Sequence, residues 1–298
     1  MRRSAQFFII FMLVMAPACS QASTAPDGEN NTPASQTYIE NKGSDTLVNL
    51  ALAWAERYQN DHPEIQISVT GGGSGTGFTA LINGTIDIAN ASRAIKSEEI
   101  DAAQTSGFEP IEFIVANDAI AVIVHRENPI NELTLEQVSK IYKGEIRNWQ
   151  ELGGEDRPVV CLSRETNSGT HVYFLETVVR LGSKEDKSIF SADTLLLPSS
   201  EGIIAEVRDN PNAIGYDGLG YVTEEVKKIA LSQPGSNKFI LPSAESVVNG
   251  EYPISRHLYM YTRGEPTGLQ KEYLDWILSP DAQEIVTELG FVPVQMGN

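Results

Sequence analysis

The sequence has few of the residues that build disulfide frameworks and metal centres. Only 2 of its 298 residues are cysteines and 4 are histidines. Cys19 lies in the N-terminal leader, so Cys161 has no partner for an internal disulfide, and we expect it to be an inert core residue. The histidines are scattered without the spacing of a metal site, and we expect no cofactor.

Positive charge is also scarce. The chain has 22 Lys and Arg residues against 40 Asp and Glu residues, which gives a formal net charge of −18 at pH 7. Removing the two positive charges of Arg2 and Arg3 from −18 gives −20 for a processed chain. This charge argues against nucleic acid as a partner. A small anion stays compatible with it, because hydrogen bonds act over a few ångströms while net charge acts at long range and is screened.

Apolar runs long enough to span a bilayer are missing. The apolar run near the N-terminus is too short to do so. Residues 7–15 are apolar, follow two arginines and precede the small residues before Cys19. This order predicts a signal peptide over residues 1–19. Cys19 is placed as in bacterial lipoproteins, so we expect lipid attachment there, although Ala16 stands where such sites usually carry Leu. The alternative is an ordinary secretory signal that is cut nearby.

The remainder of the chain divides into a tether and a globular body. Residues 20–37 are rich in Ser, Thr, Ala, Pro, Asn and Gln and show no apolar periodicity, which predicts a flexible tether. From residue 38 onwards strands and helices alternate, which predicts an α/β fold with mainly parallel sheets. Ligands of such sheets bind at the carboxyl ends of the strands.

The stretch from Arg164 to Thr170 is the strongest candidate for such a site. An apolar strand at residues 158–163 precedes it, and helical spacing of apolar residues follows it up to Gly182. Ser168 is a good N-cap, and helix N-termini with uncovered N–H groups bind anions. The guanidinium of Arg164 adds a two-pronged donor that suits a tetrahedral oxyanion.

Three other polar turns have the same form. Residues 44–46 open a helix, residues 71–77 form a glycine-rich turn that carries Ser74 and Thr76, and residues 90–93 follow a short strand. The glycine-rich turn lacks the Lys-Ser or Lys-Thr of a Walker loop. Neither it nor the stretch around Ser168 contains the Gly-x-Ser-x-Gly of a nucleophile elbow. Repetition of this turn favours an anion site over four unrelated helix caps.

The chain resembles the periplasmic phosphate-binding proteins of bacterial ABC phosphate transporters, from about residue 38 to its C-terminus. The resemblance depends on several motifs in the same order. They are Gly43-Ser44-Asp45-Thr46, Gly73-Ser74-Gly75-Thr76-Gly77, Ile88-Ala89-Asn90-Ala91-Ser92-Arg93, Arg164 with Ser168-Gly169-Thr170, Ile214-Gly215-Tyr216-Asp217-Gly218-Leu219-Gly220-Tyr221 and Tyr252-Pro253-Ile254-Ser255-Arg256.

This resemblance implies a type II periplasmic binding protein fold. Two α/β lobes, each a mainly parallel sheet flanked by helices, are joined by two crossing hinge strands and close on one dehydrated phosphate. It places lobe 1 at residues 38–118 and 257–298 and lobe 2 at residues 119–256. It also implies a binding protein without enzymatic activity that delivers inorganic phosphate to an ABC transporter permease.

The resemblance further implies a set of phosphate-binding residues drawn from both lobes. They are Ser44, Asp45, Thr46, Leu47, Ser74, Gly75, Thr76, Ser92, Arg93, Arg164, Ser168, Gly169 and Thr170.

One departure concerns selectivity. Better-known members carry an aspartate near the position of Ser92, which accepts the proton of hydrogen phosphate and so rejects sulfate. Here Ser92 and Arg93 stand in its place. Asp45 either takes over as the acceptor or is a helix cap with its carboxylate turned to solvent.

The remaining expectations concern partners and alternative functions. We expect an exported monomer, in the periplasm or at the outer face of a membrane, held there by its lipid anchor. A receptor for sulfate, molybdate or a phosphonate stays an alternative from the same fold. A secreted phosphatase is a further one, but it would need an activated nucleophile or a metal centre, and the sequence offers no histidine pair or carboxylate cluster for either. A surface protein that binds phosphate only for sensing or adhesion also stays open.

Overall fold

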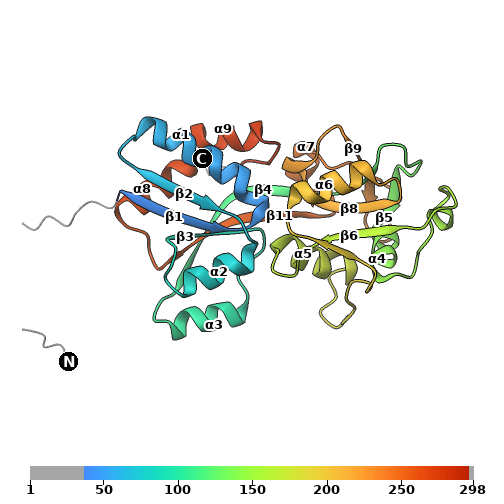
Figure 1. Ribbon diagram of the computed structural model, residues 1–298, viewed down its shortest axis with the longest axis horizontal. Helices are drawn as coiled ribbons and strands as arrows, with labels where there is room; N and C mark the ends of the chain where they lie inside the picture. The colour runs from blue at the N-terminus through green and yellow to red at the C-terminus, as the bar shows by residue number, and fades with distance from the viewer. Residues whose placement is uncertain (1–36, 295–298) are drawn as a thin grey trace, which may run out of the picture. The chain divides into compact units, whose positions relative to one another are not determined.

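The computed structural model of the chain describes residues 37–294 (Figure 1). The predicted signal peptide, Cys19 and all but the last residue of the predicted tether lie outside these residues. Among the described residues no helix has the length and apolar character needed to cross a membrane.

The first group of elements, lobe 1, is built on three parallel strands in the order β2-β1-β3. Each of these strands leads into a polar turn, so their carboxyl ends place three turns at one edge of the sheet. Helices from both ends of the chain pack on this sheet (Figure 1). The elements are β1 (Tyr38–Gly43), β2 (Gln66–Thr70), β3 (Ile88–Ala91), η1 (Asp45–Leu47), α1 (Val48–Asp61), α2 (Ser74–Ile82), α3 (Ser97–Thr105), α8 (Gly268–Ile277) and α9 (Pro280–Glu288).

Two long antiparallel strands, β4 (Pro110–His125) and β11 (Ser255–Arg263), connect the two groups of elements. The sequence predicts separate apolar runs at residues 111–115 and 119–124, whereas the structure joins them in one strand. They are continuous because residues 116–118, between the runs, also pair with β11. The first part of β4 therefore belongs to the sheet of lobe 1, and its last part pairs with β8.

The second group, lobe 2, has a sheet in which β6 is parallel to both β8 and β7. A separate two-stranded sheet joins β5 to β10. The strands are β5 (Glu132–Thr134), β6 (Val160–Arg164), β7 (Leu195–Leu197), β8 (Ala213–Gly218), β9 (Val226–Lys228) and β10 (Ala230–Ser232). The helices are α4 (Leu135–Lys143), α5 (Gly169–Phe174), α6 (Ser200–Asp209) and α7 (Ala244–Val248), with short turns η2 (Trp149–Leu152) and η4 (Leu219–Tyr221) and a π-helical turn, η3 (Leu175–Val179), that directly continues α5.

Helix α4 has suitable residues at both of its ends. Thr134 forms a capping box with Gln137, and Gly144 ends α4 in the left-handed conformation with φ 75°. The first helix differs from the prediction. It is preceded by the short 3-10 turn η1, and the side chain of Ser44 makes no capping hydrogen bond there. The polar side chains of this turn are therefore available for contacts with other parts of the fold.

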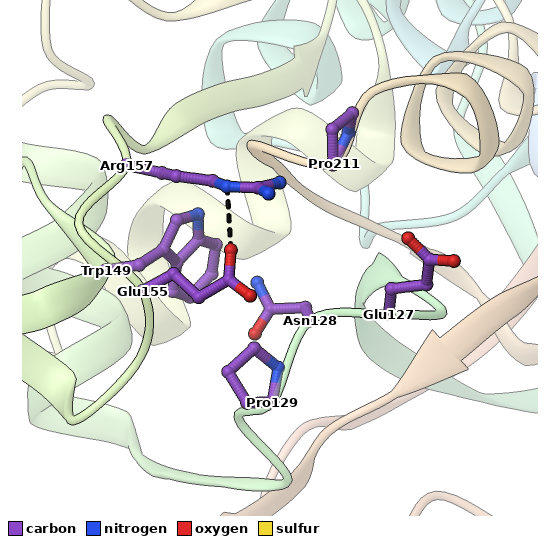
Figure 2. Close-up of a pocket in the computed structure, with 7 residues that line it drawn as sticks. All are labelled: Glu127, Asn128, Pro129, Trp149, Glu155, Arg157 and Pro211. Atoms are coloured by element: carbon purple, nitrogen blue, oxygen red, sulfur yellow. Dashed lines mark ion pairs between the residues drawn. The ribbon is translucent and has the colours of Figure 1, made fainter.

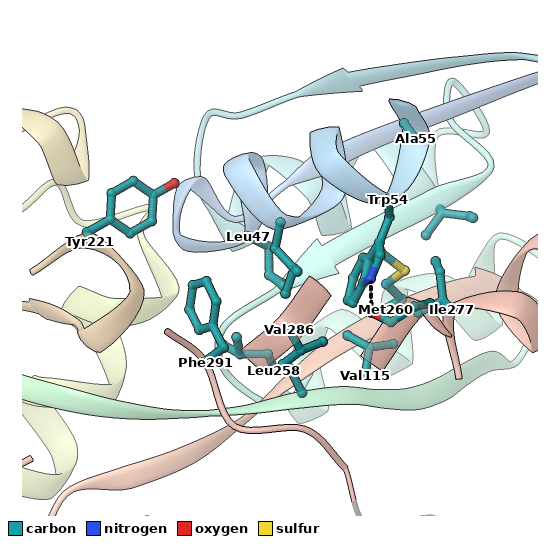
Figure 3. Packing of buried hydrophobic residues seen from close by; sticks show 14 of the residues in the cluster. Leu47, Trp54, Ala55, Val115, Tyr221, Leu258, Met260, Ile277, Val286 and Phe291 are labelled. Atoms are coloured by element: carbon teal, nitrogen blue, oxygen red, sulfur yellow. Dashed lines mark hydrogen bonds between the residues drawn. The ribbon is translucent and has the colours of Figure 1, made fainter. Parts of the chain in front are cut away.

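The hydrophobic core of lobe 1 anchors the first polar turn, η1. The side chain of Leu47 is fully buried and lies among the apolar residues of α1, β11 and α9, as Figure 3 shows. Trp54 in the same cluster donates its indole N–H to the carbonyl oxygen of Ala282, 2.8 Å away. Because η1 is anchored by this core, the neighbouring hydroxyl of Thr46 has a defined position at the edge of the sheet.

Candidate functional site

The turn after β6 has the predicted local structure. Arg164 ends β6, and Ser168 caps α5 by accepting a hydrogen bond from the backbone N–H of His171. The first N–H groups of a helix, here those of Gly169 and Thr170, have no acceptor within the helix. The side chain of Arg164 is 1% exposed and that of Thr170 is fully buried. A buried guanidinium thus lies next to a helix start in lobe 2.

The turns of lobe 1 gather at one sheet edge, as the parallel arrangement requires. The backbone N–H of Ser44 donates to the carbonyl oxygen of Asn90, 2.8 Å away. The backbone N–H of Ser92 donates to the hydroxyl oxygen of Ser74 at 3.0 Å. The side chains of Ser74 and Ser92 are fully buried, and their hydroxyl oxygens lie 3.4 Å from each other. The side chains of the three turns therefore form one polar cluster.

Residues of the two lobes meet directly at this cluster. The hydroxyl oxygens of Thr46 and Thr170 are 2.9 Å apart, and the backbone N–H of Gly75 donates to the carbonyl oxygen of Asn167 at 3.1 Å. A Cβ atom at Gly169 would lie only 2.3 Å from the hydroxyl oxygen of Ser74. The close approach between the lobes therefore requires glycine at this position.

Arg164 is fixed by a set of acceptors. Its Nη1 donates to the hydroxyl oxygen of Ser200 at 2.8 Å, and its Nη2 donates to the carbonyl oxygen of Pro198 at 2.8 Å. The same Nη2 lies 3.0 Å from Oδ2 of Asp45, and Nη1 lies 3.8 Å from Oδ2 of Asp217. Its buried Nε has no hydrogen-bond partner within the described part of the chain. One donor of this guanidinium is thus left for a ligand.

Asp45 is not a helix cap with its carboxylate turned to solvent. Its Oδ2 accepts the backbone N–H of Ser200 at 2.8 Å in addition to the ion pair with Arg164, and its side chain is 18% exposed. The carboxylate is therefore directed toward lobe 2. The backbone carbonyl of Asp45 also accepts the hydroxyl of Tyr221 at 2.9 Å, so this residue links η1 to lobe 2 twice.

Other predicted residues make contacts of their own. Arg93 forms a two-pronged ion pair with Glu99, with N–O distances of 2.8 and 2.6 Å, and its guanidinium lies over the ring of Phe78. Thr76 donates its hydroxyl to the carbonyl oxygen of Gly72 at 2.7 Å. The backbone N–H of Leu47 donates within η1. The structure therefore brings Thr46, Ser74, Ser92, Gly169 and Thr170 together. It engages the terminal nitrogens of Arg93, the hydroxyl of Thr76 and the backbone N–H of Leu47 elsewhere, while the buried Nε of Arg93 has no hydrogen-bond partner among the described residues.

Two buried charged residues of the cluster were not predicted. Arg256 on β11 and Asp118 on β4 form an ion pair with an N–O distance of 2.9 Å. Nη2 of Arg256 also lies 3.0 Å from the hydroxyl oxygen of Thr170. The sequence signal was a carboxylate directly before the apolar run 119–124 and an arginine at the end of a quoted motif. Their contact becomes visible only once β4 and β11 are known to pair.

Burial sets the protonation of the carboxylates near the cluster. Burial raises the pKa of Asp217 to about 6, against the lowering effect of the Arg164 charge. Burial likewise raises the pKa of Asp118, against the charge of Arg256. Burial also lowers the pKa of His171, so the neutral imidazole is favoured beside Arg164. Outside the cluster, burial raises the pKa of the Cys161 thiol to about 12, as expected of an unreactive cysteine.

A cleft between the lobes leads toward the cluster. It has a volume of about 470 Å³ and lies between residues 93–96 of lobe 1 and the face of α5 and η3 in lobe 2, with Arg256 among its lining residues. A second, smaller pocket lies away from the cluster, and Figure 2 shows it beside Trp149. That pocket holds about 40 Å³, and its only arginine, Arg157, is paired with Glu155 at 2.7 Å. Among the described residues no group of His, Cys, Asp and Glu is arranged to hold a metal ion.

Comparisons with known proteins agree with this arrangement. A model described as PBP superfamily domain matches residues 28–281. Among solved structures, a Clostridium perfringens protein with bound phosphate superposes with a TM-score of 0.77 and 33% identity, over 87% of this chain and 100% of that one. An ABC-type phosphate transport receptor from Vibrio cholerae superposes with a TM-score of 0.68 and 29% identity, over 86% of this chain and 100% of that one. The expected two-lobed α/β fold is therefore confirmed.

Curated relatives identify the family more closely. The phosphate-binding protein PstS of Pseudomonas aeruginosa is 34% identical over 273 residues, which cover 86% of this chain and 83% of the relative. The phosphate-binding protein PstS of Bacillus subtilis is 34% identical over 293 residues, which cover 95% of this chain and 91% of the relative. The chain therefore belongs to the PBP superfamily and, within it, to the family of the phosphate-binding proteins PstS.

Proposed function

We propose that this chain captures inorganic phosphate between its two lobes and delivers it to an ABC phosphate importer. The observation that carries the proposal is the meeting of buried hydroxyl groups from both lobes, at Thr46 and Thr170. The buried guanidinium of Arg164 is paired with Asp45, the residue next to Thr46. A tetrahedral anion accepts hydrogen bonds in several directions at once. Donors converging from two sides of a cleft suit such a ligand.

The geometry supports different roles for the predicted residues. As direct ligands we propose the hydroxyls of Thr46, Ser74, Ser92 and Thr170, the Nε donor of Arg164, and the first N–H groups of α5. Ser168 would act by capping that helix. Ser44, Leu47, Gly75 and Thr76 would shape the turns, and Asp45 would connect the lobes through Arg164. Arg93 would act at a distance, because Glu99 occupies both of its terminal nitrogens.

The cluster carries no excess of positive charge before any anion binds. Arg164 faces Asp45 and Asp217, and Arg256 faces Asp118. An anion would therefore be held mainly by oriented hydrogen bonds and less by net positive charge. This fits the strongly acidic composition of the chain. Hydrogen bonds to charged groups each contribute about 1.5–3 kcal/mol, so several of them give a tight site without excess positive charge.

The direct test is calorimetric titration of the mature chain with phosphate, sulfate, molybdate and methylphosphonate in turn. We expect the tightest binding for phosphate. Tighter binding of sulfate or molybdate would assign the chain to another oxyanion. An assay with a phosphomonoester on the same preparation is expected to release no phosphate, and turnover would contradict a binding role.

For the chain as a whole, we propose a layout that follows from export. Residues 1–19 would be a signal peptide, Cys19 a lipid attachment site, and residues 20–37 a tether that holds a monomeric body near the membrane. Lobe 1 would comprise residues 38–118 and 257–298, and lobe 2 residues 119–256. The pairing of β4 supports the boundary near residue 118, because this strand pairs with β11 up to Ala119 and with β8 from Ile120. Mass spectrometry of the exported protein would test the lipid, and Cys19→Ala is expected to release the protein from membranes.

A further inference from the structure

Arg256 and Asp118 lie opposite each other on the two strands that connect the lobes. Their Cα atoms are register partners in the antiparallel pairing of β11 with β4. Nε and Nη2 of Arg256 both donate to Oδ2 of Asp118, at 3.2 and 2.9 Å. The carboxylate is completed by the backbone N–H of Leu219, which donates to Oδ1 at 3.0 Å. Both side chains are at most 2% exposed, so the guanidinium has a fixed orientation.

This orientation directs the guanidinium to the point where the lobes meet. Nη2 of Arg256 lies 3.0 Å from the hydroxyl oxygen of Thr170 and 3.4 Å from that of Thr46. Nη1 donates to the carbonyl oxygen of Ser92 at 2.8 Å. A single side chain on a connecting strand therefore contacts the candidate site on the lobe 1 side and on the lobe 2 side.

Hydrogen-bond counting shows that this arrangement leaves a donor over. A guanidinium can only donate, so Thr46 and Thr170 must accept from Arg256. The two hydroxyls are also bonded to each other, which uses one of their two protons. The other proton remains to be donated. The two buried hydroxyls therefore hold one spare proton beside a guanidinium, and this calls for an oxygen acceptor at this point.

Arg256 lines the cleft of about 470 Å³ between residues 93–96 and α5. The wall of lobe 2 includes Tyr173, whose ring lies 5.6 Å from the Arg256 guanidinium carbon. The cleft therefore extends to the residue whose guanidinium contacts the two threonine hydroxyls.

We propose that Arg256 is a direct ligand of the bound anion, a second guanidinium carried by a connecting strand at the boundary between the lobes. This inference rests on the proposed phosphate site and names one more residue in it. Arg256 and Arg164 approach the site from different elements, β11 and the end of β6. The anion would thus be held from lobe 1, from lobe 2 and from the connection between them.

The test is phosphate titration of a double variant, Asp118→Asn with Arg256→Gln. The double change removes both charges, so neither is left buried without its partner, and the new amide oxygen keeps an acceptor for the N–H of Leu219. Thermal unfolding without phosphate checks that the variant folds. Loss of a hydrogen bond from a charged donor predicts phosphate affinity about 10- to 150-fold weaker than in the wild type. Arg263→Gln, on the same strand but directed at Leu81, is the matched control and is expected to bind like the wild type.

The outcomes separate this inference from the proposed function. If the folded double variant binds phosphate with wild-type affinity, Arg256 is not a ligand, while the proposed function stands as long as the wild type binds phosphate. If the wild type binds no phosphate, the proposed function itself is wrong. Should the double variant fail to fold, the phosphate affinity of Arg256→Lys is compared with that of the wild type instead. This variant keeps a charge opposite Asp118 but loses the fork of donors, so we expect at least a tenfold loss, and unchanged affinity would overturn the inference.

Discussion

The hydroxyl oxygens of Thr46 and Thr170 lie 2.9 Å apart, although 124 positions separate the two residues in the chain. Thr46 belongs to the turn after β1 in lobe 1, and Thr170 to the first turn of α5 in lobe 2. One hydrogen bond of this kind contributes only about 0.5–1.5 kcal/mol net. An anion that accepts from both hydroxyls can therefore replace it at small cost and connect the lobes more strongly.

Replacing Arg164 tests its place in the site. Arg164→Lys keeps one charge near Asp45 and Asp217 but loses the planar fork and the free Nε donor. We expect phosphate affinity to fall at least tenfold, because a charge-assisted hydrogen bond is worth about 1.5–3 kcal/mol. Calorimetry gives the affinity. Arg157→Lys, at the surface pair with Glu155, is the control, and equal affinities for both variants would remove Arg164 from the site.

The corresponding Arg164→Ala variant is expected to lose stability as well as affinity. It leaves Asp45 and Asp217 without their cation, and breaking a buried pair in this way costs about 3–5 kcal/mol. Urea unfolding without phosphate measures this loss. Stability equal to that of the wild type would show that the carboxylates do not depend on Arg164.

Gly169→Ala tests the close approach of the lobes. The added Cβ would lie 2.3 Å from the hydroxyl oxygen of Ser74 and 2.5 Å from that of Ser92, far inside contact distance. Because these hydroxyls belong to the opposite lobe, we expect weaker phosphate binding with little change in unfolding temperature. Gly202→Ala, in α6, meets its nearest neighbour at 3.3 Å and serves as the control. Wild-type affinity of Gly169→Ala would mean that the lobes need not approach so closely.

Asp45→Asn tests whether Asp45 connects the lobes or helps to distinguish phosphate from sulfate. The carboxylate is already bonded to Arg164 and to the backbone N–H of Ser200. We therefore expect weaker phosphate binding, because Arg164 loses an ion pair, but an unchanged ratio of phosphate to sulfate affinity. Titration with both anions measures the ratio. A ratio that falls would instead identify Asp45 as the acceptor of the phosphate proton.

The buried carboxyl of Asp217 predicts a pH dependence of stability. Its pKa is raised to about 6 by burial, so between the ordinary carboxyl pKa and that value the folded state binds more protons than the unfolded state. Its contribution therefore disfavours folding increasingly as pH rises through this window, by up to roughly 3 kcal/mol, and is constant above it.

Comparison with Asp217→Asn isolates this contribution, since Asn has no proton to lose. The stability of the wild type relative to the variant is expected to be greater at pH 4 than at pH 7, in urea unfolding without phosphate. The same relative stability at both pH values would contradict the raised pKa.

Local patterns predicted the turns well because each depends on neighbouring residues. Ser168 caps α5, and the turns at Ser44, Ser74 and Ser92 follow adjacent parallel strands. Parallel pairing alone is enough to place these three turns at one sheet edge. A strand-turn-helix pattern thus predicts the turn itself and, through parallel pairing, which other turns lie beside it.

Long-range side-chain contacts were not predictable in the same way. Nothing near Asp45 indicates that its carboxylate binds Arg164, because these residues lie in different lobes. The pairing of Asp118 with Arg256 likewise depends on the register of β4 with β11. Arg93 resembled a site residue by its position in a motif, yet Glu99, six residues later, provides a local ion-pair partner.

The most direct test of the account is a crystal structure of the protein grown with phosphate. We expect one anion within hydrogen-bond distance of Thr46, Ser74, Arg164 and Thr170 together, with contacts from both lobes. An anion bound at the surface of a single lobe, or outside the reach of Arg164, would contradict the central claim.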